Sequence, residues 1–254
     1  MWVLETVAVA FGMYSALPVP RVEWNEKNMR YALLAFPLVG AVLGLAWCGA
    51  AALCAALGLP DVLRGAALCA LPVVVTGGIH LDGYADTCDA LASHASPVRK
   101  QEILRDPHCG AFAVIRLCVY FVAYFALCSA VTPTDAALWS VGLGFVLSRA
   151  LSGLLLTLLS VVDGSSLAKA FVSAADKRRA RALLGIVTLL LAAALAPRSV
   201  AAVCAAALVV WRYVRMAKQE FGGTSGDLAG WFLVKAEFWM LAAIVAQQYV
   251  EKLI

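Results

Sequence analysis

The sequence has few charged side chains for its length. Lys, Arg, Asp and Glu make up 14% of the 254 residues, whereas about 25% is usual in soluble globular domains. Hydrophobic residues make up 63%. So little charge cannot cover a soluble surface of this size, which excludes an ordinary soluble domain. The excess apolar area indicates an integral membrane protein.

The cysteine spacing, the small net charge and the scarcity of charge in residues 1–20 argue against further classes of protein and signal. The eight cysteines include no C-x-x-C pair, and most stand in apolar runs, where a thiol behaves as a small hydrophobe. This argues against a zinc or disulfide framework. The net charge of +4 is small and dispersed, which argues against nucleic-acid binding. Residues 1–20 carry a single charge, Glu5, and no basic start, so we expect no cleavable signal peptide there.

The apolar stretches predict an all-α fold, a polytopic transmembrane helix bundle of about seven spans. Each crossing needs roughly 20 predominantly apolar residues in a helix. The candidate spans are residues 33–57, 62–78, 111–131, 136–160, 182–196, 199–214 and 228–250. Residues 1–20 could form an interfacial or re-entrant helix, or could themselves span the membrane. We expect residues 1–254 to form one integral membrane domain with hydrophilic loops near 21–32, 79–110, 161–181 and 215–228.

The basic residues predict the orientation of these spans. Only Arg64, Arg198 and Lys252 fall on one side of the membrane. Fourteen fall on the other side: Arg21, Lys27, Arg30, Arg99, Lys100, Arg105, Lys169, Lys177, Arg178, Arg179, Arg181, Arg212, Arg215 and Lys218. Because Lys and Arg are enriched in cytoplasmic loops, we expect the long hydrophilic loops, and any chemistry on water-soluble substrates, to face the cytoplasm.

The densest polar cluster is residues 77–89, with the sequence GGIHLDGYADTCD. If this segment is helical, Asp82, Asp86 and Asp89 share one face at spacing i, i+4, i+7. Three stacked carboxylates repel one another, and a hard cation such as Mg²⁺ would relieve that repulsion. A solvated acidic helix start is the alternative. His80 could be a hydrogen-bonded structural group, or else a ligand or a base.

A second polar segment, residues 100–110, mixes cations with Asp106 just before another candidate span. Lys100 and Arg105 could neutralise phosphate oxygens, Arg by paired hydrogen bonds. The alternative is ordinary flanking charge that only orients the protein in the membrane.

A third polar segment, residues 222–227 (GGTSGD), opens the last span. Its glycines, Gly223 among them, could let the backbone approach an anion, or could form a simple connection. Charges inside spans are costly and usually face a cavity or a partner. Those charges are Arg116, Arg149, Lys235 and Glu237.

Taken together, these segments resemble cobalamin synthase, the adenosylcobinamide-GDP ribazoletransferase family. Its hallmark G-G-x-H-L-D-G-x-A-D-T-x-D is matched by residues 77–89. Further matches are Leu17 to Pro20, Phe36 to Gly40, Arg105 to Val114, Ser148-Arg149 and Gly222 to Asp227. One departure is that His108 stands where the family usually has an arginine.

The resemblance implies a transferase that joins adenosylcobinamide-GDP to α-ribazole or its 5′-phosphate and releases GMP, with Mg²⁺ as cofactor. It implies catalytic roles for His80, Asp82, Asp86, Asp89 and Asp106. Substrate binding falls to Lys100, Arg105, Arg149, Gly223, Asp227 and Glu237, and metal binding to Asp82, Asp86 and Asp89. The implied location is the lipid bilayer of a bacterial or archaeal cytoplasmic (inner) membrane. The protein could form a homo-oligomer there.

Two other functions compete with this interpretation. A CDP-alcohol phosphotransferase would need an aspartate in place of Ile79 and an Ala-Arg pair in place of Asp86-Thr87. A transporter of cations or corrinoids could use the charges within spans, but the polar segments gather at one membrane face. Release of GMP in detergent distinguishes an enzyme from a transporter.

A two-substrate transfer also predicts how the segments meet, because the reacting groups must lie about 3–3.5 Å apart. We expect Asp82, Asp86 and Asp89 to face Arg105, Asp106, Asp227 and Glu237 across one cavity, with Arg149 reaching toward it. Asp227 should then lie within about 15 Å of Asp82.

Overall fold

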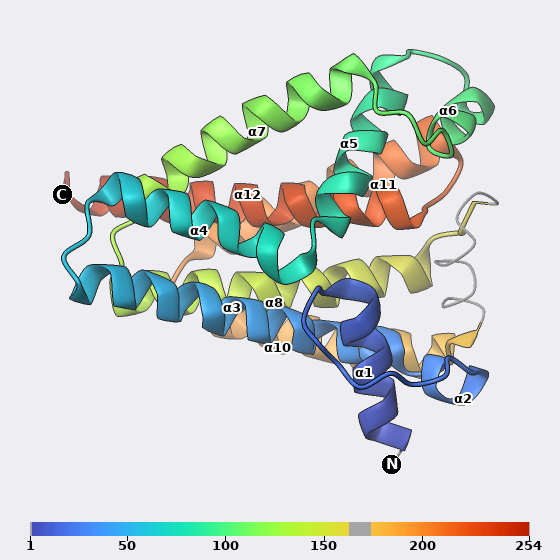
Figure 1. Ribbon diagram of the computed structural model, residues 1–254, viewed down its shortest axis with the longest axis horizontal. Helices are drawn as coiled ribbons and strands as arrows, with labels where there is room; N and C mark the ends of the chain where they lie inside the picture. Colours follow the sequence, from blue (N-terminus) through green and yellow to red (C-terminus); the bar gives the residue numbers. More distant parts are fainter. Residues whose placement is uncertain (1, 163–173, 254) are drawn as a thin grey trace.

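The computed structural model describes residues 2–162 and 174–253, and these residues form a helical bundle. The helices are α1 (Trp2–Tyr14), α2 (Glu26–Met29), α3 (Ala32–Ala56), α4 (Asp61–Thr76), α5 (Ile79–Ala92), α6 (Pro97–Ile103), α7 (Ala111–Ala130), α8 (Asp135–Leu158), α10 (Lys177–Leu195), α11 (Val200–Phe221) and α12 (Gly226–Glu251). Figure 1 shows α3, α4, α8, α10, α11 and α12 along the long axis, with α7 inclined to them. The predicted all-α bundle is confirmed.

Five of these helices, α3, α7, α8, α11 and α12, are long and apolar enough to cross a membrane. Helices α4 and α5 together would make a sixth span, but α5 is bent by 94° from α4 and stands across the bundle in Figure 1. By length and composition alone, five or six spans therefore qualify, against about seven expected from the sequence. The apolar stretch 182–196 falls in α10, whose start is too basic to provide a long apolar window. We do not count α5 as a membrane span.

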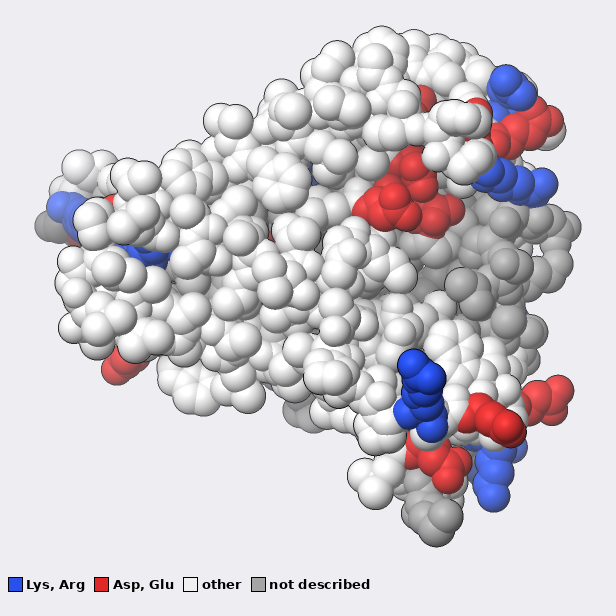
Figure 2. All heavy atoms as spheres, viewed as in Figure 1, with Lys and Arg blue, Asp and Glu red and all other residues white. Residues whose placement is uncertain are grey.

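The polar connections gather at one end of the bundle, which we call the polar end. The connections before α3, from α4 to α7 and from α11 to α12 lie there (Figure 1). Figure 2 shows much of the visible charge at this end and little over the middle of the molecule. The described parts of the hydrophilic segments thus lie at one end of the bundle, and their common location on the cytoplasmic side stays a prediction. Residues 163–173, with Lys169, lie outside the described residues.

The N-terminal segment forms α1, an apolar helix of 13 residues. This helix is shorter than a membrane crossing requires. The backbone N–H of Ala16 donates to the carbonyl of Val75 at 2.9 Å, which fastens the segment after α1 to the end of α4. Of the alternatives that the sequence left open, the structure therefore favours a short helix at the polar end over a further span.

Helices α3 and α8 pack with their backbones close together. A Cβ added to Gly40 would lie 2.4 Å from the carbonyl oxygen of Phe145, and one added to Gly44 would lie 2.8 Å from that of Gly142. Small residues four apart allow such close approach between membrane helices. Gly40 also leaves room for Arg149, whose Cδ would lie 2.7 Å from the added Cβ. These close contacts leave no room for a side chain at position 40, which explains why the segment 36–40 ends in glycine.

Candidate active site

A glycine pair redirects the chain at the start of the candidate site. Gly77 and Gly78 have φ angles of 66° and 79°, a left-handed conformation that residues with a Cβ rarely adopt. Gly77 caps α4, and Gly78 precedes α5. The chain turns by 94° here, so α5 leaves the direction of the bundle. The prediction that the acidic segment is helical is confirmed.

The start of α5 packs directly on the start of α12. A Cβ at Gly83 would lie 2.7 Å from the Cα of Asp227, and one at Gly230 would lie 2.9 Å from the carbonyl oxygen of His80. Neither position has space for a side chain. Because consecutive Cα atoms are about 3.8 Å apart, Asp82 lies well within the expected distance of Asp227. The structure thus joins the first and third polar segments.

This packing gathers three carboxylates, those of Asp82, Asp86 and Asp227, into what we call the acidic patch. Burial, followed by the charges of Asp82, Asp227 and Asp89, raises the pKa of Asp86 to about 7. The charge of Asp82 also acts on Asp227. Figure 2 shows acidic side chains gathered beside α5. Each ionised carboxylate in the patch therefore disfavours ionisation of its neighbours.

The donor chemistry of the acidic patch fits Mg²⁺. Carboxylate oxygens are the hard ligands that this ion prefers, and a divalent cation would relieve the repulsion that raises the pKa of Asp86. As the side chains are placed, no group of three or more His, Cys, Asp or Glu in the described residues surrounds one point as metal ligands would. The fit therefore rests on the type, charge and proximity of the donors.

Asp89 has a separate role at the end of α5. Its carboxylate accepts hydrogen bonds from the backbone N–H groups of Gly110, at 2.6 Å, and Ala113, at 2.9 Å. Both amides belong to the start of α7, where a carboxylate satisfies free N–H groups and meets the positive end of the helix dipole. A Cβ at Gly110 would lie 2.3 Å from the Asp89 carboxylate. Asp89 thus fastens α5 to α7, and its expected role as a metal ligand stays a prediction.

Lys100 is also engaged in a structural contact. Its buried ammonium pairs with Glu220, and the side chain of Gln101 donates to the carbonyl of Phe221 at 2.7 Å. Both partners belong to the last turn of α11. These contacts fasten α6 to α11. Sequence reasoning missed Glu220, because nothing local marks a partner 120 positions away.

Arg105 and Asp106 lie exposed in the connection from α6 to α7. Asp106 accepts a hydrogen bond from the backbone N–H of His108 at 3.0 Å and contacts the His108 Nδ1 at 2.7 Å. These two hydrogen bonds lower the pKa of Asp106. The residue that departs from the family pattern is thus the partner of Asp106. None of these contacts joins Asp106 to the acidic patch.

Arg149 and Glu237 form a buried ion pair instead of facing the acidic patch. The fully buried Arg149 donates through Nη1 to Glu237 Oε1 at 2.5 Å and to the carbonyl of Phe145 at 3.0 Å. Ser148 Oγ also donates to Glu237, at 3.1 Å. Glu237 follows Asp227 by ten residues, or about 15 Å along α12. The structure therefore separates this pair from the patch with which it was expected to share one cavity.

His80 faces the buried pair. Its side chain lines a small internal cavity that Arg149 and Glu237 also line, and its ring lies edge-on to Phe36 at 5.9 Å between centroids. Its Nε2 is shielded from solvent and has no hydrogen-bond partner among the described residues. The charge of Arg149 acts on the ring. This position favours a structural role for His80 over that of a base acting at the acidic patch.

The glycine-rich turn before α12 is fastened to the end of α8. The N–H of Gly223 donates to the carbonyl of Ala217 at 2.9 Å, and that of Thr224 donates to Ser160 at 2.8 Å. A Cβ at Gly223 would lie 2.3 Å from the Ser160 carbonyl oxygen. These amides already have acceptors, so the turn positions the start of α12. The structure gives no support to an anion-binding role for Gly223.

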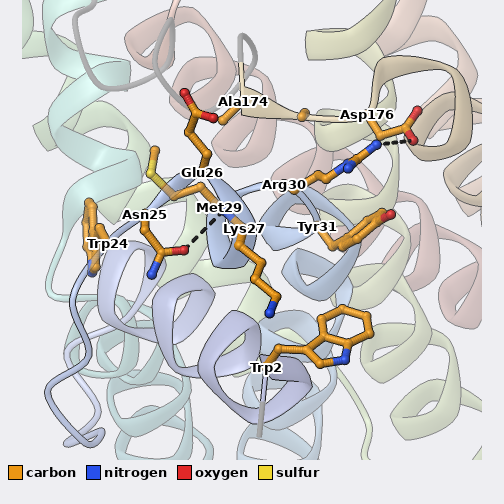
Figure 3. A pocket seen from close by; sticks show the side chains of 11 residues that line it. Trp2, Trp24, Asn25, Glu26, Lys27, Met29, Arg30, Tyr31, Ala174 and Asp176 are labelled. Carbon is orange, nitrogen blue, oxygen red and sulfur yellow. Dashed lines mark hydrogen bonds and ion pairs between the residues drawn. The ribbon is translucent and has the colours of Figure 1, made fainter.

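A larger cavity, of about 1100 Å³, also lies at the polar end. Three aromatic residues, Trp2, Trp24 and Tyr31, line it together with Lys27 and Arg30. Figure 3 shows Lys27 directed toward Trp2, and the ion pair that joins Arg30 to Asp176 at 3.3 Å. Aromatic faces and cations can hold planar rings and phosphate groups. The described contacts do not join this cavity to the acidic patch.

Comparisons with known proteins cover almost the whole chain. The model of the cobalamin-5-phosphate synthase family matches residues 6–245. The chain is similar to the adenosylcobinamide-GDP ribazoletransferase of Lachnoclostridium phytofermentans, with 41% identity over 96% of this chain and 95% of the relative. Proteins of the same name from Azorhizobium caulinodans (34% identity, 90% of each chain) and Clostridium perfringens strain 13 (30%, 92% of this chain and 94% of the relative) are also similar. No solved structure matches the chain. The chain belongs to the cobalamin-5-phosphate synthase family.

Proposed function

We propose that this membrane protein is an adenosylcobinamide-GDP ribazoletransferase, which joins adenosylcobinamide-GDP to α-ribazole or its 5′-phosphate and releases GMP. The family match and the names of the relatives support the activity. The structural observation that carries the proposal is the close packing of Gly83 on Asp227. This contact brings together carboxylates from two segments far apart in the sequence.

The proposed reaction exchanges one phosphate bond. A ribose hydroxyl oxygen of the ribazole bonds to the phosphorus that carries cobinamide, and the bond from this phosphorus to the bridging oxygen of GMP breaks. Such transfers depend mainly on positioning and on neutralising charge. In this proposal Asp82, Asp86 and Asp227 would hold Mg²⁺, which would neutralise diphosphate charge. A carboxylate of the site accepts the hydroxyl proton.

The proposal also includes location in a cytoplasmic (inner) membrane with the acidic patch facing the cytoplasm. The excess of Lys and Arg around the polar segments supports this orientation. The family match and the relatives named above do not support the two competing functions, a CDP-alcohol phosphotransferase and a transporter. A transporter would move substrate across sealed vesicles without forming GMP.

The direct test uses purified protein in detergent with adenosylcobinamide-GDP, α-ribazole and Mg²⁺. We expect GMP and a cobalamin product in equal amounts, and chelation should stop the reaction until Mg²⁺ is restored. Asp82→Asn, Asp86→Asn and Asp227→Asn should each lower turnover by about 100-fold or more. Asp135→Asn is the matched control, because this exposed aspartate starts α8 at the opposite end of the bundle.

Folded protein that forms no GMP from these substrates would overturn the assignment of the activity. Full turnover after chelation would reject Mg²⁺ while leaving the activity in place. Full turnover in Asp227→Asn would reject the role of the contact between α5 and α12.

A further inference from the structure

Three cations away from the acidic patch lie within helices that we treat as membrane spans. They are Arg116 on α7, Arg212 on α11 and Lys235 on α12. Arg116 is five residues from the polar-end terminus of its helix, or about 8 Å along the axis. Arg212 and Lys235 are each nine residues from theirs, or about 14 Å. All three therefore lie beyond the first turn of their helices.

These cations converge on one place. The charges of Arg116 and Arg212 both act on the ammonium of Lys235. The Lys235 Nζ lies 5.3 Å from the centre of the Tyr84 ring, and the charge of Arg116 also reaches Tyr84. We call Arg116, Arg212 and Lys235 the basic cluster. Its members come from three separate helices, and Lys235 connects it to α5 through Tyr84.

Helix α5 separates the basic cluster from the acidic patch. Each residue adds about 100° around a helix axis, so Tyr84 lies about 200° from Asp82. Asp86 lies only about 40° from Asp82, on the acidic face. Lys235 therefore contacts the face of α5 opposite to the carboxylates. This arrangement explains why the acidic patch does not neutralise the cluster.

No carboxylate within the described residues forms an ion pair with any member of the basic cluster. Arg149 on α8 has Glu237 as its partner. A cation inside a span is costly unless it faces water or an anion, and three together also repel one another. The ring of Tyr84 offsets only part of this cost for Lys235. Among the described residues, the cluster therefore has no anionic partner.

The surroundings of the two arginines indicate where the anion comes from. Both Arg116 and Arg212 are exposed, and so are the apolar side chains beside them in sequence, Ile115 and Trp211. Large exposed apolar side chains on a membrane span face lipid. The two arginines of the basic cluster are thus exposed beside side chains that face lipid. The 26 residues of α12 measure about 39 Å, more than the roughly 30 Å hydrocarbon core. Long cationic side chains can reach the headgroups from this depth.

We propose that Arg116, Arg212 and Lys235 bind the phosphate group of an anionic phospholipid in the leaflet at the polar end. The lipid would neutralise the cluster and support the face of α5 that turns away from the acidic patch. This role lies beyond the proposed transferase activity. It gives the catalytic helix a direct contact with the membrane, which the exchange of a phosphate bond does not itself require.

The test measures lipid binding to the full-length protein, purified in detergent and stripped of lipid. Native mass spectrometry and thermal unfolding should show binding and stabilisation by phosphatidylglycerol, and much less by zwitterionic phosphatidylcholine. Affinity for phosphatidylglycerol should fall about fivefold for each cation removed, in Arg116→Gln, Arg212→Gln and Lys235→Met. Lys218→Gln is the matched control, because it removes an exposed cation from the last turn of α11 and should leave binding unchanged.

Unchanged binding in the Arg116→Gln, Arg212→Gln double variant would overturn the proposal. Both side chains are exposed, so this variant should fold even if Lys235→Met does not. Inorganic pyrophosphate serves as the probe for a water-soluble ligand. If it stabilises the protein as well as phosphatidylglycerol does, and the double variant loses that effect, the cluster binds substrate phosphate and the lipid proposal fails. GMP formation, measured separately, reports on the transferase activity.

Discussion

Replacing Gly83 with alanine should separate the two halves of the acidic patch. The new Cβ would lie 2.7 Å from the Cα of Asp227 and 2.8 Å from its carbonyl oxygen, and neither backbone atom can rotate away. Ordinary contact begins at 3.4 Å, so α5 and α12 must move apart by about 0.7 Å. Overpacking of this kind costs about 1–3 kcal/mol of unfolding free energy. A displacement near 1 Å at reacting groups can lower turnover by about 100-fold.

The assay combines GMP formation at saturating substrate with thermal unfolding in detergent. Gly185→Ala is the matched control, because its added Cβ would meet no atom within 4 Å and alanine favours a helix interior by about 1 kcal/mol. We expect the control to keep its activity. Gly83→Ala should lose turnover at temperatures where it remains folded. Turnover within about twofold of the unmodified protein would refute the argument that this close approach positions the carboxylates.

Three further predictions follow from contacts of the described residues. Glu237→Gln should lower the unfolding free energy by about 3 kcal/mol, since it leaves Arg149 buried without its charged partner. The double variant with Arg149→Met should recover part of this loss. If the losses of the two single variants simply add in the double variant, the ion pair does not stabilise the fold as argued. Asp89→Asn should cost about 1 kcal/mol by weakening the start of α7 yet keep measurable GMP formation, whereas equal losses in Asp89→Asn and Asp82→Asn would contradict the difference in role. A membrane-impermeant maleimide should label the exposed Cys109 from the cytoplasmic face only, and labelling from outside intact cells would reverse the proposed orientation.

The bundle and the helical acidic segment could be predicted because they depend on local properties. Long apolar runs require helices in lipid, and the spacing of Asp82, Asp86 and Asp89 suits one helix face. Helix α10 meets the sequence criterion for a span least well, because its apolar run of 15 residues follows a strongly basic start. That run is shorter than the roughly 20 residues of a typical crossing, so α10 is not among the helices that qualify by length and composition alone.

The partners of the site residues could not be predicted, since they depend on packing between distant segments. Asp89 and Asp86 look alike in the sequence, yet one meets the amides of α7 and the other meets carboxylates. The sequence suggests phosphate binding for Lys100, whereas in the structure its ammonium pairs with Glu220 on α11. The proximity of Asp227 to Asp82 depends on the absence of a side chain at Gly83, which no spacing in the sequence reveals.

The left-handed pair Gly77–Gly78 sets how far the chemistry lies from the membrane. In a continuous helix, α5 would extend α4 outward, and Asp89 would lie about 15 Å beyond Ile79 along the axis. The carboxylates would then lie on a solvent-exposed helix that extends beyond the bundle, without contact to either α7 or α12. The turn lays the same residues back over the end of the bundle, where two other helices can hold them. A substitution that made α4 and α5 one continuous helix would keep every acidic residue in the sequence, yet the carboxylates would no longer lie together.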